Sequence, residues 1–247
     1  PWKWHKDLFN YAKEIGITIF SSPFDPTAVD FLETLNSPAY KIASFELVDI
    51  PLIQKAAVTG KPLIISTGMG PLKEIEEAIS AARNAGCIDL IILHCVSAYP
   101  APPESTFLLN IRDIADQFDV CTGLSDHTLG STTSIAAVCL GAHFIEKHLT
   151  LSRESGGVDS AFSLEPDEFK YMVDEIRRAS KSMNGPIYGP KDSEKESVNY
   201  RRSLYVVSNI KKGDAFTSDN VRSIRPGFGL APKNLNSVLK KYASRDI

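Results

Sequence analysis

The chain has 247 residues, of which 43% are hydrophobic and 23% are charged, and its formal net charge is -3. This length predicts one large α/β domain with a small appendage. The nearly balanced charge argues against nucleic acid or an anionic membrane surface as a partner. No apolar run approaches the length of a membrane span, so we expect neither a membrane anchor nor a signal peptide.

Four cysteines, without any Cys-x-x-Cys spacing, lie in apolar segments. This pattern is typical of buried free thiols in a reducing compartment. We therefore expect a cytoplasmic protein whose cysteines Cys87, Cys95, Cys121 and Cys139 are all buried and unpaired.

Strand-like and helix-like segments alternate up to about residue 185. Short apolar runs at 17–21, 39–44, 62–67, 89–95, 120–125 and 143–149 predict buried parallel strands. Helices are predicted at about 4–14, from 26, and at 50–59, 71–85, 110–118, 131–140 and 166–183. This alternation predicts a parallel sheet covered by helices.

Six strands fit either a doubly wound sheet or a (β/α)8 barrel that lacks two of its strands. Polar residues stand at the carboxyl end of nearly every predicted strand. They favour the barrel, because an open sheet gathers its site residues at one switch point instead. These residues are Ser22, Ser44, Glu46, Ser66, Thr67, His94, Ser97, Ser125, His127 and His148.

The composition changes after residue 184. Residues 185–199 are rich in Gly, Pro, Lys, Glu and Ser, which predicts a linker. From residue 200, short strand-like runs and turns predict a small β-rich module. The expected organisation is a domain at 1–184, a linker at 185–199 and a module at 200–247.

His127 and His148 each close a short apolar run, and one helix-length segment separates the two runs. Neighbouring strands lie about 4.8 Å apart, so two imidazoles at equivalent strand ends can share one divalent metal ion. Glu146 precedes His148 by two residues and faces the same side of the strand. A lone histidine here is more often structural, but the matched pair favours a Lewis-acid metal site and hence an enzyme.

Six separated phrases occur in a recognisable order: SSPFD (21–25), YKIASFE (40–46), STGM (66–69), SDHT (125–128), EKH (146–148) and RPG (225–227). With these phrases the chain resembles the sialic acid synthase family, most closely its pseudaminic acid synthase branch. The resemblance implies a TIM barrel followed by an antifreeze-like (SAF) domain. It also implies that the first two barrel strands and the end of the SAF domain are missing from this chain, as in a piece of a longer protein.

The resemblance implies condensation of phosphoenolpyruvate with an N-acetylated amino sugar, by a domain-swapped homodimer. It implies that His127 and His148 bind a divalent metal ion, Mn2+ or a similar ion such as Mg2+ or Co2+. It assigns catalysis to Lys41, Glu46 and Glu146. The substrate-binding residues that it implies are Ser44, Ser66, Tyr99, Ser125, Asp159 and Arg225, with the arginine supplied in trans. Ser22 and Ser97 stand where sialic acid synthases commonly have other polar residues, and we predict that they also bind substrate.

The choice of sugar depends on fewer residues. Ser160 and Ala161 replace the His-Lys pair that N-acetylneuraminate synthases usually carry, and Phe162 adds apolar area. This favours a 6-deoxy sugar, 2,4-diacetamido-2,4,6-trideoxy-altrose, and pseudaminic acid as the product. Legionaminate or N-acetylneuraminate synthesis is the alternative, and a non-catalytic sugar-binding module is the alternative of another class.

Structural roles compete for some of these residues. Serines at strand ends commonly cap the following helix. Asp126, which precedes the first histidine, could orient an imidazole or cap a helix, and the sequence leaves both possibilities open.

Overall fold

A computed structural model describes residues 2–247, which form two compact units, one ending at Asn184 and one spanning Gly185–Ile247. The first unit is built on a five-stranded parallel sheet in the order β1-β2-β3-β4-β5. The strands are β1 (Tyr40–Ile42), β2 (Leu63–Ser66), β3 (Leu90–Cys95), β4 (Cys121–Asp126) and β5 (Phe144–Lys147).

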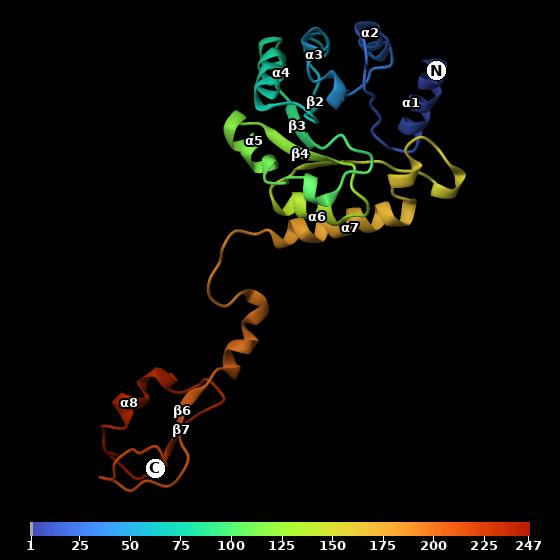
Figure 1. Ribbon diagram of the computed structural model, residues 1–247. Coiled ribbons are helices and arrows are strands. Elements are labelled where there is room, and N and C mark those ends of the chain that lie inside the picture. Colours follow the sequence, from blue (N-terminus) through green and yellow to red (C-terminus); the bar gives the residue numbers. More distant parts are fainter. Residues whose placement is uncertain (1) are drawn as a thin grey trace. The chain divides into compact units, whose positions relative to one another are not determined.

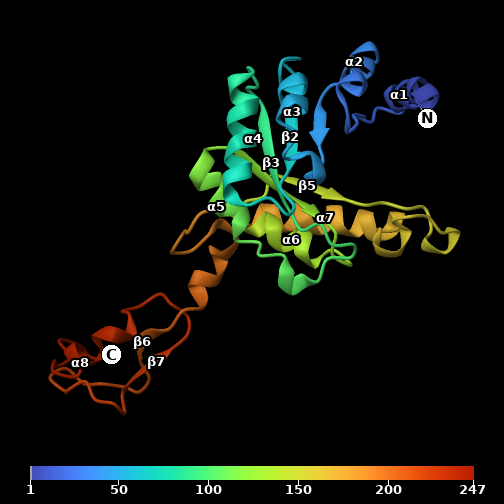
Figure 2. The same cartoon turned by 45° about the horizontal axis from the view of Figure 1, so that its top comes forward.

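Seven α-helices accompany the sheet, and Figures 1 and 2 show them arranged around its outer side in chain order. They are α1 (His5–Glu14), α2 (Pro26–Thr34), α3 (Ile50–Ala57), α4 (Leu72–Asn84), α5 (Asn110–Phe118), α6 (Thr132–Cys139) and α7 (Pro166–Ser182). The curled parallel sheet with its outer helices is half of a TIM-type barrel, which confirms the predicted fold class. No helix described between residues 2 and 247 has the length and hydropathy needed to cross a bilayer.

Local sequence signals set the helix starts. The Asp25 carboxylate accepts a hydrogen bond of 2.9 Å from the Ala28 N–H, and Pro26 occupies the first turn of α2. Asp49 caps α3 in the same way, through a 3.1 Å bond from the Leu52 N–H. The main core lies between the sheet and these helices, and its members with 0% exposure include Tyr40, Ile42, Leu52, Ile53, Leu63 and Ile65.

The first of the six predicted strands is wrong. Residues 17–21 form no strand, and only Ser21 makes an isolated parallel bridge, to Tyr40. The Lys41 N–H lies 3.4 Å from the Ser21 carbonyl oxygen, which is a weak hydrogen bond. Ile17 is 60% exposed, so this apolar run has little packing to hold it in a ladder.

The prediction of four buried thiols is also wrong in part. All four cysteines are free, and Cys87 and Cys95 are buried, but Cys121 and Cys139 are exposed. Cys121 is the first residue of β4 and Cys139 is the last residue of α6, so both stand where an element leaves the core.

The second unit contains a two-stranded antiparallel sheet of β6 (Ser203–Val206) and β7 (Val221–Ile224), and the helix α8 (Leu235–Val238). Within 185–199, where the composition predicts a linker, lie the short 3-10 helix Asp192–Glu194 and the start of another, Glu196–Tyr200. The loop after β7 is held at two points. The Gly227 N–H donates to the Asn199 carbonyl at 2.9 Å, and the Tyr205 hydroxyl donates to the Pro226 carbonyl at 2.9 Å.

The loop after β5 runs back to the start of α7. It is fixed at both sides of Leu149, because the Leu164 N–H donates to the His148 carbonyl and the Thr150 N–H donates to the Leu164 carbonyl, each at 2.9 Å. The Ser163 hydroxyl donates to the Asp159 carbonyl at 2.7 Å. These bonds fix the path of the segment that carries Asp159.

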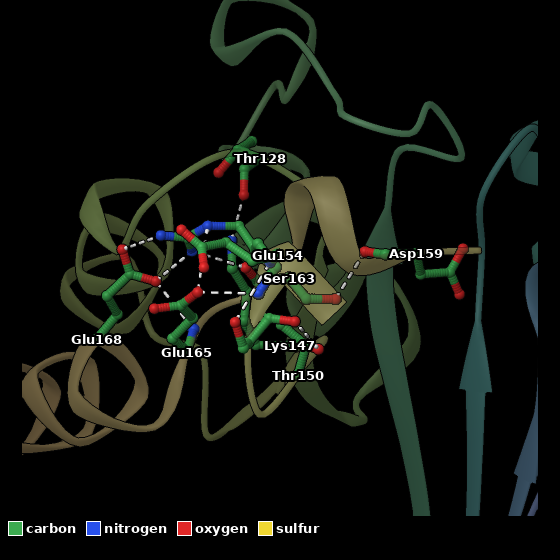
Figure 3. A network of polar contacts seen from close by, with 10 residues as sticks. Thr128, Lys147, Thr150, Glu154, Asp159, Ser163, Glu165 and Glu168 are labelled. Carbon is green, nitrogen blue, oxygen red and sulfur yellow. Dashed lines mark hydrogen bonds and ion pairs between the residues drawn. The ribbon is translucent and has the colours of Figure 1, made fainter. Parts of the chain in front are cut away.

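Arg153 clamps this loop to α7. Its guanidinium donates to the Glu168 carboxylate at 2.5 and 2.9 Å and to the Ser163 carbonyl at 3.1 Å. Its backbone N–H donates to the Glu165 carboxylate at 2.9 Å. Figure 3 shows Glu165, Glu168 and Ser163 within this network. The bidentate contact is the strong form of an Arg–carboxylate pair.

The first prediction concerns the close packing of neighbouring strands around Gly123. Gly123 lies in β4 between β3 and β5, and an added Cβ would stand 2.2 Å from the Phe144 carbonyl oxygen and 2.7 Å from the Leu93 Cδ2. Gly123→Ala should therefore cost about 1–3 kcal/mol of unfolding free energy or more, measured by chemical denaturation. Gly185→Ala, where no atom lies within 4 Å, is the control and should change little. Equal stability of the two variants would contradict this packing.

The second prediction concerns the effect of Arg153 on the pKa of Glu168. The hydrogen bond from Arg153 lowers the pKa of Glu168 from 4.5 to about 2. A lowered folded-state pKa stabilises the fold above the unfolded value, and this stabilisation is lost as the pH falls through about 2. Arg153→Gln should move the pKa of Glu168 back up toward its ordinary value, measured by NMR of the carboxyl carbon.

The matched control for this titration is Lys170→Gln. Lys170 pairs with Asp174 at 2.6 Å on the same helix and does not take part in the clamp. This variant should leave the pKa of Glu168 near its low value. If Glu168 titrates alike in the Arg153→Gln variant and the unaltered protein, Arg153 does not hold it.

Candidate active site

The register of β4 and β5 brings the two predicted metal ligands together. Ser125 pairs with Glu146 and Asp126 pairs with Lys147, so His127 and His148 follow at equivalent strand ends. Their ring centroids lie 5.2 Å apart. The closeness expected from the sequence is therefore present in the fold.

A polar chain crosses the concave face of the sheet. Lys41 lies on β1 and Glu146 on β5, which are the two edge strands, yet the Lys41 Nζ lies 3.2 Å from the Glu146 Oε2. The Ser125 hydroxyl donates to the other carboxylate oxygen at 2.7 Å. The sheet thus curls far enough to bring side chains from its opposite edges into contact.

Glu46 stands in the short 3-10 helix Ser44–Glu46, directly after β1. Burial raises the pKa of its carboxyl group, and the charge of Asp49 adds to this effect, while Lys41 opposes it. Its Oε2 is buried and has no hydrogen-bond partner among residues 2–247. A carboxyl group in this state can exchange a proton closer to neutral pH than an ordinary glutamate.

Small polar groups line the ends of β2 and β3. The Gly68 N–H donates to the Ser44 hydroxyl at 3.2 Å, and a Cβ at Gly68 would stand 2.1 Å from the Ser97 Oγ. The Ser66 hydroxyl is buried and lacks a partner in the described part of the chain. These donors, with the Lys41 ammonium, form an arrangement that suits a carboxylate or a phosphate.

Each histidine places its Nδ1 beside an acceptor. The His127 Nδ1 lies 3.0 Å from the Val96 carbonyl oxygen, which can only accept, so Nδ1 carries the hydrogen. The His148 Nδ1 lies 3.5 Å from the Asp159 Oδ2. This pattern leaves Nε2 of each ring as the free donor of a lone pair, as metal-binding histidines require.

The two imidazoles differ in basicity. Burial opposes the charge of His127, but its contacts with the Cys95 thiol and the Val96 carbonyl raise its pKa above the ordinary value. Burial and the neighbouring His127 lower the pKa of His148. Cys95, whose Sγ lies 3.8 Å from the His127 Nδ1, is desolvated, yet hydrogen bonds from His127 and Ser44 lower its pKa.

Tyr99 and Phe162 pack around the imidazoles. The Tyr99 ring lies 4.5 Å from the His127 ring and 5.5 Å from Phe162, and Phe162 lies 5.1 Å from the His148 ring. Phe162 is 5% exposed, whereas Tyr99 is 46% exposed. The site therefore has one apolar wall beside its polar chain.

Two predicted site residues remain to be placed, Ser22 in the first unit and Arg225 in the second. Ser22 follows the isolated bridge at Ser21, at the edge of the sheet beside β1. Arg225 is exposed in the second unit, in the loop after β7. The sequence predicts Cys95 only as a buried thiol and does not single out Gly68 as a close neighbour of the serines. Cys95 ends a predicted strand and Gly68 directly follows one, so their positions were the available signal.

The sequence predicts two metal ligands, His127 and His148. Among residues 2–247 no group of three or more His, Cys, Asp or Glu side chains converges at metal-binding spacing. Two imidazole donors with free Nε2 atoms still fit a divalent ion that keeps open positions. A closed structural metal site, which needs four protein ligands, does not fit.

Comparison with known proteins shows the family of this chain. The NeuB family profile matches residues 1–188, and the SAF domain profile matches residues 201–247. The chain is 44% identical over 247 residues to a pseudaminic acid synthase from Helicobacter pylori, covering 99% of this chain and 72% of that protein. It is 38% identical to an N,N'-diacetyllegionaminic acid synthase from Campylobacter jejuni, covering 99% and 74% respectively.

A solved structure gives the same answer for the fold. The N-acetylneuraminic acid synthetase of Leptospira borgpetersenii matches with a TM-score of 0.76 and 33% identity, over 81% of this chain and 70% of that chain. The resemblance inferred from the separated motifs is confirmed. The chain belongs to the NeuB family, is an enzyme of the sialic acid synthase type and carries a SAF domain.

Proposed function

We propose that this enzyme condenses phosphoenolpyruvate with 2,4-diacetamido-2,4,6-trideoxy-altrose to give pseudaminic acid and phosphate. One observation carries the proposal: the Lys41–Glu146–Ser125 chain meets the two imidazoles at one set of strand ends. The 44% identity to a protein named pseudaminic acid synthase supports this branch. Legionaminate synthesis is the alternative, supported by the relative at 38% identity.

The donor substrate carries a carboxylate and a phosphate, and both need cations or hydrogen-bond donors. The Lys41 ammonium is almost buried, so it would interact strongly with one of these groups. The hydroxyls of Ser44, Ser66 and Ser125 would donate hydrogen bonds to the carboxylate and phosphate oxygens of the donor substrate. The unpartnered hydroxyl of Ser66 is free to donate such a bond.

The reaction begins when C3 of phosphoenolpyruvate attacks the aldehyde carbon of the open-chain sugar. A carbon–carbon bond forms, and the aldehyde oxygen takes up a proton and becomes a hydroxyl. Water then adds to C2, and the tetrahedral intermediate expels phosphate as the C2–O bond breaks. Glu46, with its raised pKa and unpaired oxygen, orients this water and accepts its proton.

His127 and His148 would hold a divalent ion such as Mn2+, Mg2+ or Co2+ through their Nε2 atoms. The acceptor beside each Nδ1 supports this role, because it fixes the tautomer and the ring orientation. Such an ion supplies Lewis-acid polarisation of the sugar aldehyde. Asp159 would then orient the His148 ring and also face the sugar.

The apolar wall supports a 6-deoxy sugar. Phe162 and Tyr99 lie against the imidazoles, and a methyl group would pack there better than a hydroxyl. The second unit would complete the site in a domain-swapped homodimer, with Arg225 of one subunit facing the substrate of the other. The bonds from Gly227 and Tyr205 hold the loop that presents this arginine.

The acceptor preference is the third prediction. With phosphoenolpyruvate and Mn2+, the whole protein should turn over the trideoxy-altrose far better than N-acetylmannosamine, measured as phosphate release. The methyl in place of one hydroxyl contributes about 1–3 kcal/mol, and the second acetamido group and different stereocentres add to the preference. Preference for a legionaminate or neuraminate precursor would overturn the branch, and no phosphate release with any sugar would favour a sugar-binding module.

The donor contact is the fourth prediction. Lys41→Met removes the ammonium and keeps most of the apolar stem. The KM for phosphoenolpyruvate should rise by about tenfold or more, with a smaller change for the sugar, because a charge-assisted contact is lost. Lys55→Met, which breaks a surface pair with Asp30, is the control and should leave both constants unchanged. An unaltered KM for phosphoenolpyruvate in Lys41→Met would give Lys41 a structural role.

A further inference from the structure

A second charged pair lies behind the two histidines. Asp126 and Lys147 each precede one of the histidines, and they pair in register on β4 and β5. Their side chains are 1% exposed, and the Lys147 Nζ lies 3.0 Å from the Asp126 Oδ2. Because side chains alternate along a strand, this pair lies on the face opposite to Ser125, Glu146 and the imidazoles.

The carboxylate of Asp126 is saturated with hydrogen bonds. It accepts from the Thr128 N–H at 2.9 Å, the Thr128 hydroxyl at 2.8 Å and the Ser134 hydroxyl at 2.6 Å. Lys147 also donates to the Thr128 carbonyl, and Figure 3 shows Lys147 and Thr128 joined in this way. The residues on both sides of His127 are therefore fixed.

The same pair reaches the second histidine. Lys147 directly precedes His148 in the chain. The His148 carbonyl oxygen accepts a hydrogen bond of 2.9 Å from the Leu164 N–H, so the backbone is fixed on both sides of this histidine. Ser134 lies in the first turn of α6, so Asp126 also ties the end of β4 to the helix that follows it. The pair thus connects β4, β5 and α6 at the point where the imidazoles leave the sheet.

Stability alone gives a poor account of this arrangement. Two charges lose their hydration when they are buried, and apolar side chains of similar volume are often as stabilising or more so. A directional pair offers what an apolar contact does not, which is a fixed register and orientation of the two strand ends. Ring orientation is what a shared metal site needs from its supporting residues.

We infer that Asp126 and Lys147 are positioning residues, and that their buried pair sets the spacing and orientation of His127 and His148 for a shared divalent ion. This inference rests on the two-histidine site in the proposed function. It also answers the question that the sequence left open, because the Asp126 side chain acts through Thr128, Ser134 and Lys147 and not by direct contact with an imidazole.

The test compares stability with Mn2+ affinity in the whole protein. Asp126→Asn and Lys147→Met each leave one buried charge without its partner, so both should lower the unfolding midpoint and weaken Mn2+ binding. The double variant Asp126→Asn/Lys147→Met removes both charges. It should regain much of the lost stability, while its Mn2+ Kd, measured by calorimetry or by electron paramagnetic resonance, stays about 10-fold to 100-fold weaker.

A double variant with the Kd of the unaltered protein would overturn the inference, because the pair would then serve stability alone. Ser134→Ala removes one bond to the carboxylate and keeps both charges, so it provides a milder variant if the double variant does not fold. It should weaken Mn2+ binding by about 2-fold to 5-fold and lower the unfolding midpoint less than either single charge variant does, since one hydrogen bond to the carboxylate is lost while both charges stay paired. An unchanged Kd in this variant would also count against the inference.

Two controls separate this inference from the proposed function. His127→Ala should abolish tight Mn2+ binding, and if it does not, the two-histidine site itself is wrong. If His127→Ala abolishes binding but the double variant binds normally, only the role of the pair fails. Lys55→Met, which breaks a surface pair of 2.6 Å remote from these strand ends, should change neither the Kd nor the midpoint by much.

Discussion

The site depends on the curvature of one parallel sheet. Lys41 on β1 and Glu146 on β5 come from opposite edges, and their contact at 3.2 Å requires the five strands to curl around a common interior. Parallel strands twist in one sense, and helices on the outer side leave the inner side of the curled sheet free for the site. Lys41, Ser125 and Glu146 then meet on the inner face of the sheet, where a small anionic substrate can be surrounded.

Strands β4 and β5 use their two faces for different purposes. The inner face carries Ser125, Glu146 and the histidines, which can touch substrates. The outer face carries the buried pair of Asp126 and Lys147, which lies away from the substrate side of the sheet. A buried ion pair is a costly way to join two strands, and its position directly before both imidazoles connects that cost to the geometry of the site.

The loop after β5 adds the apolar side of the site. It carries Asp159 and Phe162 to the histidines, and its course is set by Leu164 and by Arg153, which binds Glu168 at the start of α7. Asp159 and Phe162 thus depend on side chains that do not contact a substrate. Under the proposed function, this loop would select the sugar, while the strand ends would hold the groups that form the carbon–carbon bond.

Local sequence predicts the alternation of strands and helices, the placement of His127 beside His148 and the family, because periodicity, strand-end polarity and short motifs are encoded in neighbouring residues. It mispredicted 17–21 as a strand and Cys121 and Cys139 as buried, because burial depends on what packs against a segment. Two contacts could not be predicted in this way, the one between Lys41 and Glu146 and the one between Asp126 and Lys147. These contacts join residues far apart in the chain, and strand register and sheet curvature, which are long-range properties, bring them together.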